Sequence, residues 1–67
     1  MSEQMSVEPI VLTVEEAADL LRIGRSSAYA LTRLWRESEG RAGLPVVKIG
    51  GSLRVPRAAL LAMVTAA

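Results

Sequence analysis

Residues 12–37 read LTVEEAADLLRIGRSSAYALTRLWRE and contain two helical patterns with a short break between them. Thr13 and Glu16 have the spacing of a capping box, in which each side chain binds the backbone amide of the other residue. Glu15 and Asp19 place further negative charge near the positive end of the same helix. The apolar residues then recur at helical spacing, which predicts a helix over 14–22: Val14, Ala17, Ala18 and Leu21.

The break falls at Gly24, which could supply a positive φ or serve as the N-cap of the next helix. We expect that second helix to begin at Arg25 or Ser26 and to end at Glu37 or Ser38. Its apolar residues should face the first helix, and the large one among them is expected to be a core residue: Ala28, Leu31 and Trp35. Two short helices joined by a glycine turn are typical of a helix-turn-helix motif, although an ordinary helical hairpin has the same pattern.

A second decisive stretch, PVVKIGGSLRV at 45–55, predicts a β-hairpin. Residues 45–49 and 53–55 have the composition of two strands. Gly50-Gly51-Ser52 between them favours a tight turn, because glycine readily takes a positive φ. The polar residues 38–43, with two glycines, predict a loop before the first strand.

The remaining segments complete one domain. Residues 10–12 are apolar and form either a brief strand or a hydrophobic staple before the first helix. Pro56 ends the hairpin, and a helix over 58–66 is expected to pack Leu60 and Val64 against the first helix. Two strands need the helices to form a core. The sequence therefore predicts an α+β fold, a small winged helix-turn-helix of three helices with a two-stranded hairpin wing, spanning residues 10–67 after a flexible tail over 1–9.

Charge is divided unevenly along the chain, although the formal net charge is only +1. All eight basic residues lie within 22–57, where two acids leave a net charge of +6, while residues 1–21 carry −5. This asymmetry favours a polyanionic partner. The alternative is a basic face that is simply exposed to solvent.

Polar side chains gather at the start of the second predicted helix. Arg25, Ser26 and Ser27 lie where helix amides attract phosphate and where side chains of a recognition helix meet base edges. Tyr29, one turn further on, could donate its hydroxyl to a phosphate, or it could be a half-buried core aromatic. Arg33 and Arg36 continue the same side of the helix, so this side is a candidate contact surface for DNA.

The predicted hairpin offers a second candidate surface. Lys48 and Arg54 flank the glycine turn. A glycine-rich tip lets the backbone approach DNA closely, and a neighbouring cation can bind phosphate or enter the minor groove. The alternative is a plain surface hairpin that carries two solvated cations.

Other chemistry finds no support in the sequence. The absence of Cys and His excludes disulfides, thiol and histidine catalysis and the common zinc sites. No phosphate-binding glycine motif occurs, and capping explains the acids of the first helix. The N-terminus lacks the features of a signal peptide, and no apolar run approaches the ~20 residues of a membrane span. We therefore expect a cytoplasmic protein that is not an enzyme, with no catalytic residues, metal, cofactor, small-molecule substrate or membrane partner.

Three stretches of the chain resemble the excisionase-type DNA-binding domain, a relative of the MerR winged helix-turn-helix. They are LTVEEAADLL at 12–21, IGRSSAY at 23–29 and LPVVKIGGSLRVPRAAL at 44–60. The resemblance covers nearly all of residues 10–65. It implies a recognition helix in the major groove, a wing in the minor groove, bending of the DNA, and cooperative, often head-to-tail, binding to direct repeats.

Carried over by position, the resemblance implies helix contacts from Arg25, Ser26, Ser27, Tyr29 and Arg33, and wing contacts from Lys48, Gly51, Ser52 and Arg54. The chain departs from the family pattern at three places. Gly24 stands where the family usually has Ser or another good N-cap, and Ala30 replaces the basic residue that often follows the tyrosine. The loop over 37–43 is longer than the family's usual link to the wing.

The leading function that the resemblance implies is that of a phage or plasmid excisionase, also called a recombination directionality factor. Such a protein binds and bends attachment-site DNA and directs an integrase towards excision. Its partners would be double-stranded DNA, an integrase, and further copies of itself bound cooperatively. Two alternatives stay open: a small transcription regulator of the same family, and an adaptor whose wing and third helix bind protein.

Overall fold

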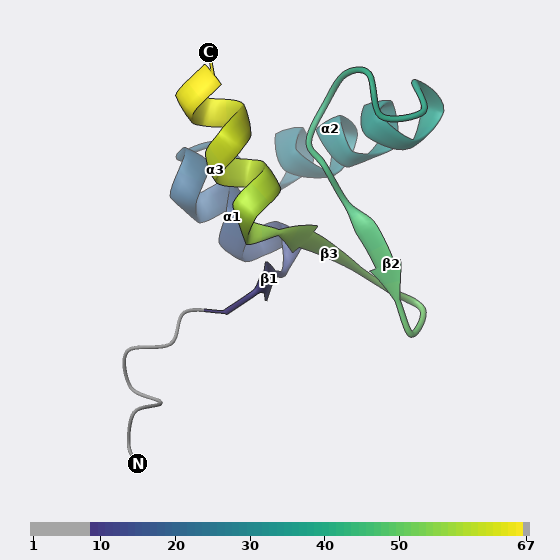
Figure 1. Cartoon of the computed structure of the whole chain (residues 1–67), viewed down its shortest axis with the longest axis horizontal. Helices are drawn as coiled ribbons and strands as arrows, with labels where there is room; N and C mark the ends of the chain where they lie inside the picture. Colours follow the sequence, from purple (N-terminus) through teal and green to yellow (C-terminus); the bar gives the residue numbers. More distant parts are fainter. Residues whose placement is uncertain (1–8, 67) are drawn as a thin grey trace.

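The computed structural model describes residues 9–66, and these form three helices and a three-stranded antiparallel sheet (Figure 1). This confirms the predicted α+β winged helix-turn-helix. Of the predicted tail, residues 1–8 lie outside the described residues. The elements follow the chain in the order β1 (Val11–Leu12), α1 (Val14–Leu21), α2 (Arg25–Glu37), β2 (Val47–Ile49), β3 (Ser52–Pro56) and α3 (Arg57–Ala66).

The capping box at the start of α1 is present as predicted. Thr13 Oγ1 accepts a hydrogen bond from the Glu16 amide at 3.0 Å, and Glu16 Oε1 accepts one from the Thr13 amide at 2.9 Å. The helix ends at Leu21, one residue earlier than expected, because Arg22 takes a left-handed conformation with φ 61° and ψ 42°. In that conformation the Arg22 amide donates to the Asp19 carbonyl, which closes the last turn.

The sequence left two roles open for Gly24, a positive φ or the N-cap of the next helix, and the structure gives it only the second. Gly24 is the N-cap of α2, with an extended backbone at φ −73° and ψ 158°, and the positive φ belongs to Arg22 instead. The Gly24 carbonyl accepts the first bond of the helix from the Ala28 amide at 3.0 Å. Because glycine has no side chain, α2 begins without a side-chain cap.

The segment after α2 folds back onto that helix rather than looping away from it. Ser38 Oγ accepts hydrogen bonds from the amides of Arg41 and Ala42 at 3.2 and 3.0 Å. Gly43 then lies directly on α2: a Cβ added to it would meet the Leu31 carbonyl oxygen at 2.3 Å. The next residue, Leu44, donates its amide to the same carbonyl and is fully buried. The long loop thus fixes where β2 begins relative to α2.

Trp35 lies against this loop, and its predicted position was wrong. It was expected to face α1 in the core, but it is half-buried and its ring lies beside Gly40, where an added Cβ would be 3.4 Å from Cζ2. The other two residues of that predicted face are placed as expected, since Ala28 is buried in the core and Leu31 packs against it. The loop after α2, rather than α1, therefore covers the apolar face of α2 at its last turn.

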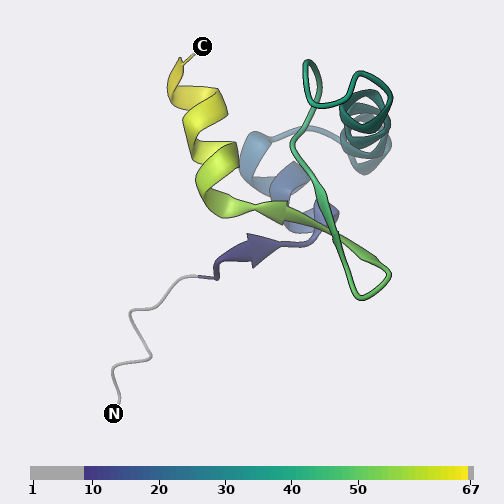
Figure 2. The ribbon, with the colours of Figure 1, turned by 45° about the vertical axis from the view of Figure 1, so that its right-hand side comes forward.

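The sheet has the strand order β1-β3-β2, with both pairs antiparallel. β1 pairs Leu12 with Val55, so the apolar run before α1 is a strand. Gly50 and Gly51 form a two-residue turn between Ile49 and Ser52. A tight hairpin turn of this kind needs a positive φ at both of its residues, and the two glycines have φ of 56° and 85°. β2 is shorter than predicted and β3 is longer. Figure 2 shows the hairpin extending beyond the helices.

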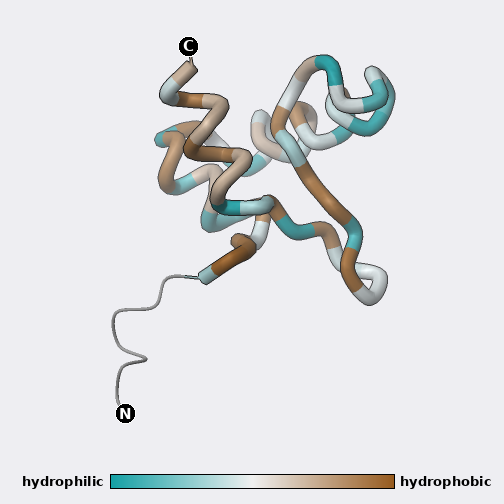
Figure 3. Tube along the Cα trace, in the orientation of Figure 1, coloured by the Kyte–Doolittle hydropathy of each residue, from teal (hydrophilic) through white to brown (hydrophobic). Residues whose placement is uncertain are grey.

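The core lies where the helices meet the base of the sheet, and β1, β3, all three helices and the loop contribute to it. Apolar segments of the strands and of α3 converge there in Figure 3. Its buried cluster consists of Leu12, Val14, Ala17, Ala18, Ala28, Leu44, Val55 and Leu60.

α3 follows β3 without a linker, so the sheet sets its direction. Leu60 is buried as expected. Val64 was expected beside it but is 45% exposed, and Met63 packs against the core in its place. The inward face of α3 therefore runs through Leu60 and Met63 rather than through Leu60 and Val64.

Candidate functional site

The exposed side of α2 carries most of the predicted helix residues. Arg25, Tyr29 and Arg33 follow one another at intervals of four residues, and all three are exposed. Successive residues turn by about 100° around a helix, so these three and Ser26 share one side. Ser27 lies about 200° from Arg25 and is therefore on a different side. The structure brings together four of the five predicted helix residues.

A neighbouring side of α2 packs on the rest of the domain and holds this surface in place. Ala28 and Thr32 are buried against the rest of the domain. The Thr32 hydroxyl donates to the Tyr29 carbonyl at 2.7 Å, so this buried polar group has its hydrogen bond. The buried side of the helix thus fixes the rotation of α2 about its axis, and with it the direction in which Arg25 and Tyr29 point.

Tyr29 makes a contact that the sequence did not predict. Its side chain is 40% exposed, and its hydroxyl donates a hydrogen bond of 2.6 Å to Glu15 Oε2 on α1. This bond lowers the pKa of Glu15 below its ordinary value of 4.5, and the backbone, Arg25 and Arg54 act in the same direction. The same bond raises the pKa of Tyr29 above its ordinary value of 10.0. Tyr29 is therefore neither a simple core aromatic nor an unoccupied donor in the free protein.

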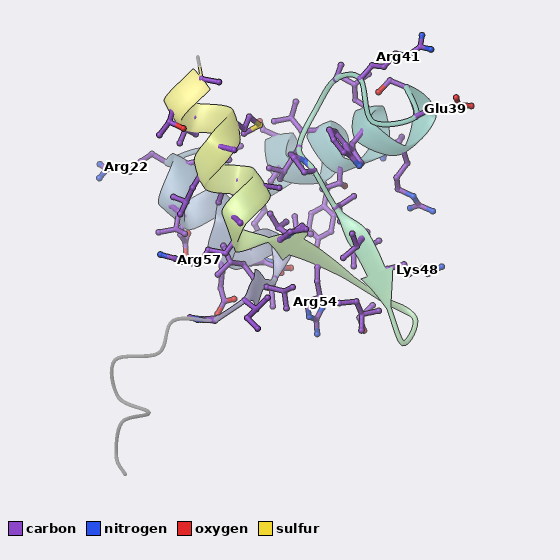
Figure 4. All side chains as sticks on the ribbon, in the orientation of Figure 1. Arg22, Glu39, Arg41, Lys48, Arg54 and Arg57 are labelled. Carbon is purple, nitrogen blue, oxygen red and sulfur yellow. The ribbon has the colours of Figure 1, made fainter. Side chains whose placement is uncertain are left out.

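The two predicted cations of the wing project from opposite faces of the hairpin. Val47 pairs with Arg54 and Lys48 pairs with Leu53. Directly paired residues share a face and successive residues alternate, so Arg54 and Lys48 point to different sides. Figure 4 shows the two side chains diverging from the strands.

Of the two wing cations, Arg54 is the one whose charge acts on the Glu15–Tyr29 pair. Its charge, with that of Arg25, lowers the pKa of Glu15. It is partly buried, and its Nη1 donates to the Leu53 carbonyl at 2.8 Å, which holds the side chain along the strand. Arg25 on α2 and Arg54 on β3 therefore both act electrostatically on the Glu15–Tyr29 pair, and we call these four residues the cluster.

The tip of the wing is open on all sides. Gly51 and Ser52 are exposed, and an added Cβ at Gly51 would meet no atom within 4 Å. The backbone at the tip can therefore come close to a partner molecule, as the glycine turn led us to expect.

Glu15 is the member of the cluster that sequence reasoning missed. In the sequence, an acid at this position near the start of α1 already has a local explanation, the favourable interaction with the helix dipole. Its partner Tyr29 lies fourteen residues away on another helix, and no local spacing connects the two.

Within residues 9–66, no enclosed pocket is found, and no group of three or more acidic, His or Cys residues is placed to hold a metal ion. None of the helices in this same range is long and apolar enough to cross a membrane. The cluster of α2 and wing residues is thus an open surface rather than a cavity.

Comparison with known proteins gives one positive result. A family model described as a helix-turn-helix domain matches residues 11–67. Searches of the curated proteins and of the solved structures found no significant match. The matched range begins at β1 and includes both helices of the motif, the docked loop, the wing and α3.

Proposed function

Because the chain belongs to the helix-turn-helix domain family, which supports a DNA-binding role, we propose that it binds double-stranded DNA with α2 in the major groove and the wing against the adjacent minor groove. The observation that carries this proposal is that the exposed side of α2 and the wing each supply a cation, Arg25 and Arg54, whose charges lower the pKa of the same carboxylate, Glu15. Recognition helices dock by such exposed sides, and wings dock by cations beside a narrow tip.

The proposed contacts divide into two kinds. Arg25 and Ser26 in the first turn of α2 would reach base edges, where Arg bonds bidentately to guanine. Tyr29 and Arg33 would contact the phosphate backbone, while Ser27 lies on a different side of α2 from these contacts. Lys48, Gly51, Ser52 and Arg54 of the wing would position the domain on the backbone of the neighbouring groove. Base contacts specify a sequence, while phosphate contacts affect all sequences alike.

The test begins with selection of a preferred duplex from a randomised pool, followed by fluorescence anisotropy with that duplex and with a scrambled one. Arg25→Ala is expected to reduce the discrimination between them by about 1–3 kcal/mol, the worth of a bidentate base contact. Arg54→Ala is expected to weaken binding to both duplexes equally and to reduce the slope of log affinity against log salt by about 1.

Arg41→Ala is the matched control. Arg41 is exposed and lies in the loop after α2, at the top of the view in Figure 4, whereas the wing tip lies at the bottom. Its loss changes the net charge by the same amount as that of Arg25 or Arg54. If Arg41→Ala weakens binding as much as either of them, the proposed surface is wrong. If Arg25→Ala leaves discrimination unchanged, the proposed docking of α2 is wrong.

Within DNA binding, we propose the specific role of an excisionase that bends attachment-site DNA and directs an integrase towards excision. The support is the resemblance carried by LTVEEAADLL at 12–21 and KIGGSLRVPRAAL at 48–60. Cooperative binding by several copies and an integrase partner belong to the same proposal. The two roles predict different results, because an excisionase alters the outcome of recombination and a transcription regulator of the same fold does not.

An excision assay in vitro is the decisive experiment for this role. Attachment-site DNA, the integrase that acts on it and the purified protein are combined, and excised product is measured with and without the protein. We expect product only when the protein is present, and a circular-permutation gel assay should show a bent complex. Specific, unbent binding with no effect on excision would favour a transcription regulator.

A further inference from the structure

Glu15 places a carboxylate on a surface that is otherwise basic. It is the second residue of α1, yet it reaches across to α2 and accepts the Tyr29 hydroxyl at 2.6 Å. The neighbouring Glu16 has a local task, because its carboxylate binds the Thr13 amide. Glu15 makes no such contribution to the capping box, so its contact with Tyr29 calls for a separate explanation.

The groups around the Glu15 carboxylate are those that bind a phosphate oxygen. A tyrosine hydroxyl donates to it, the backbone amide of Glu15 itself in the first turn of α1 stabilises it, and the positive charges of Arg25 and Arg54 act on it from two other elements. Hydroxyls, amides at a helix start and guanidinium groups are the donors that proteins direct at DNA phosphates. The protein's own carboxylate therefore occupies a site with the chemistry of an anion site.

We propose that Glu15 is an internal competitor for a DNA phosphate: it accepts the Tyr29 hydroxyl in the free protein, and a backbone phosphate takes its place when DNA binds. This inference rests on the proposed DNA binding. A phenolic hydroxyl has one proton and can donate to one of the two anions. The carboxylate must also turn away from the phosphate, because like charges repel.

Competition of this kind lowers affinity for every DNA sequence by the same factor, since a phosphate carries no sequence information. Glu15 would thus restrain non-specific binding to the backbone without changing the preferred site. Base contacts from the first turn of α2 would keep their full effect. The predicted signature is a variant that binds more tightly but not more selectively.

The experiment measures the anisotropy of the selected and scrambled duplexes at about 50 mM salt, where phosphate contacts contribute strongly. Glu15→Gln is expected to bind both duplexes roughly threefold to tenfold more tightly, because a neutral amide oxygen accepts the Tyr29 hydroxyl more weakly than a carboxylate does and does not repel the phosphate. Glu16→Gln is the matched control, because it changes the net charge equally while glutamine retains the capping box. Its gain in affinity should be clearly smaller.

Two further variants separate competition from simple charge. In a Tyr29→Phe background the gain from Glu15→Gln should shrink, because no hydroxyl is left to compete for. Glu15→Asp keeps the charge but shortens the reach to the hydroxyl, and its affinity should lie between those of the wild type and Glu15→Gln. Circular dichroism melting curves check that every variant is folded at the assay temperature.

The possible failures are distinguishable. If the wild type binds no duplex, the proposed function fails, and this inference fails with it. If the wild type binds DNA but Glu15→Gln binds no more tightly, or gains no more than Glu16→Gln, only the competitor role is overturned. Weaker binding by Glu15→Gln would show that the Glu15–Tyr29 bond prepares α2 for DNA, which is the opposite role.

Discussion

Replacing Gly43 with alanine should loosen the joint between α2 and the wing. An added Cβ would lie 2.3 Å from the Leu31 carbonyl oxygen and 2.7 Å from the Trp35 amide nitrogen. Both are backbone atoms of α2, so neither can rotate out of the way. The residue also has φ +100°, a region that side chains other than glycine rarely adopt.

The expected cost has two parts. The backbone conformation costs about 1–2 kcal/mol for a residue with a Cβ, and the overlap adds roughly 1–3 kcal/mol because packed atoms must shift. The sum is about 2–5 kcal/mol, against a total stability of roughly 3–10 kcal/mol for a domain of this size. Gly43→Ala should therefore lose a large fraction of its stability, while the overlap also disturbs the bond from the Leu44 amide to Leu31.

Gly51→Ala is the matched control. Gly51 has a comparable φ of +85°, but nothing lies within 4 Å of the added Cβ. This variant therefore bears the conformational cost of about 1–2 kcal/mol without the overlap. The difference between the two alanine variants isolates the contact between the loop and α2.

Thermal unfolding followed by circular dichroism measures both variants. For a domain of 60–100 residues, each 1 kcal/mol shifts Tm by about 4–8 °C. Gly43→Ala should melt at least ~10 °C below the wild type, and clearly below Gly51→Ala. Equal melting temperatures for the two variants would refute the reasoning, because the loop would then not be docked on α2.

Three further predictions concern α1, the turn and the α1–α2 contact. Arg22→Gly should raise the free energy of unfolding by about 0.5–1 kcal/mol, because Arg22 is left-handed at φ 61°; a lower Tm would contradict this. Gly24→Ser should stabilise by about 0.5–1 kcal/mol, since the N-cap is extended and has free space for a capping side chain; urea unfolding measures it, and an unchanged midpoint would argue against the cap. Glu15→Gln should lower the pKa of Tyr29 towards 10.0, which absorbance reports cleanly because the chain has one tyrosine; an unchanged titration would show that the hydroxyl does not bind Glu15. In the wild type the contact's contribution to stability is present above pH 4.5, the ordinary Glu value, and is lost as pH falls through the lowered pKa of Glu15. At the alkaline end it is present below pH 10.0 and is lost as pH rises through the raised pKa of Tyr29.

The features that the sequence predicted correctly are local ones. The capping box of Thr13 and Glu16 involves residues three apart, and the start of α2 follows from the break at Gly24. Two consecutive glycines between two strand-like segments indicate a tight hairpin turn. These signals are sufficient for the order of elements and for the fold class, because each depends on a few neighbouring residues.

Two of the errors concern which part of the protein covers a helix face. The helical period correctly places Trp35 on the apolar side of α2. It does not reveal that the loop at Gly40, and not α1, packs against the Trp35 ring. Val64 was expected to be buried because its spacing from Leu60 allows it, but the direct junction of β3 and α3 aims Met63 inward. The spacing of apolar residues along a helix does not specify which other segment packs against them.

The wing shows how one residue of register changes a site. The sequence suggested a three-residue turn over Gly50-Gly51-Ser52, which would set Lys48 directly opposite Arg54. The structure has a two-residue turn, so Lys48 pairs with Leu53 and the two cations face opposite sides. A shift of one residue moves a side chain to the other face of a strand, and composition alone does not distinguish the two turns.

The central claim is that the wing and the first turns of α2 form one surface, and that this surface binds duplex DNA. Backbone amide chemical shifts of the 15N-labelled protein, recorded during titration with the selected duplex, test it most directly. The claim predicts that the largest shifts occur at residues 25–33 and 48–54, with small ones in the loop over 38–44 and in α3. Shifts concentrated in that loop or in α3, with residues 25–33 unaffected, would contradict it.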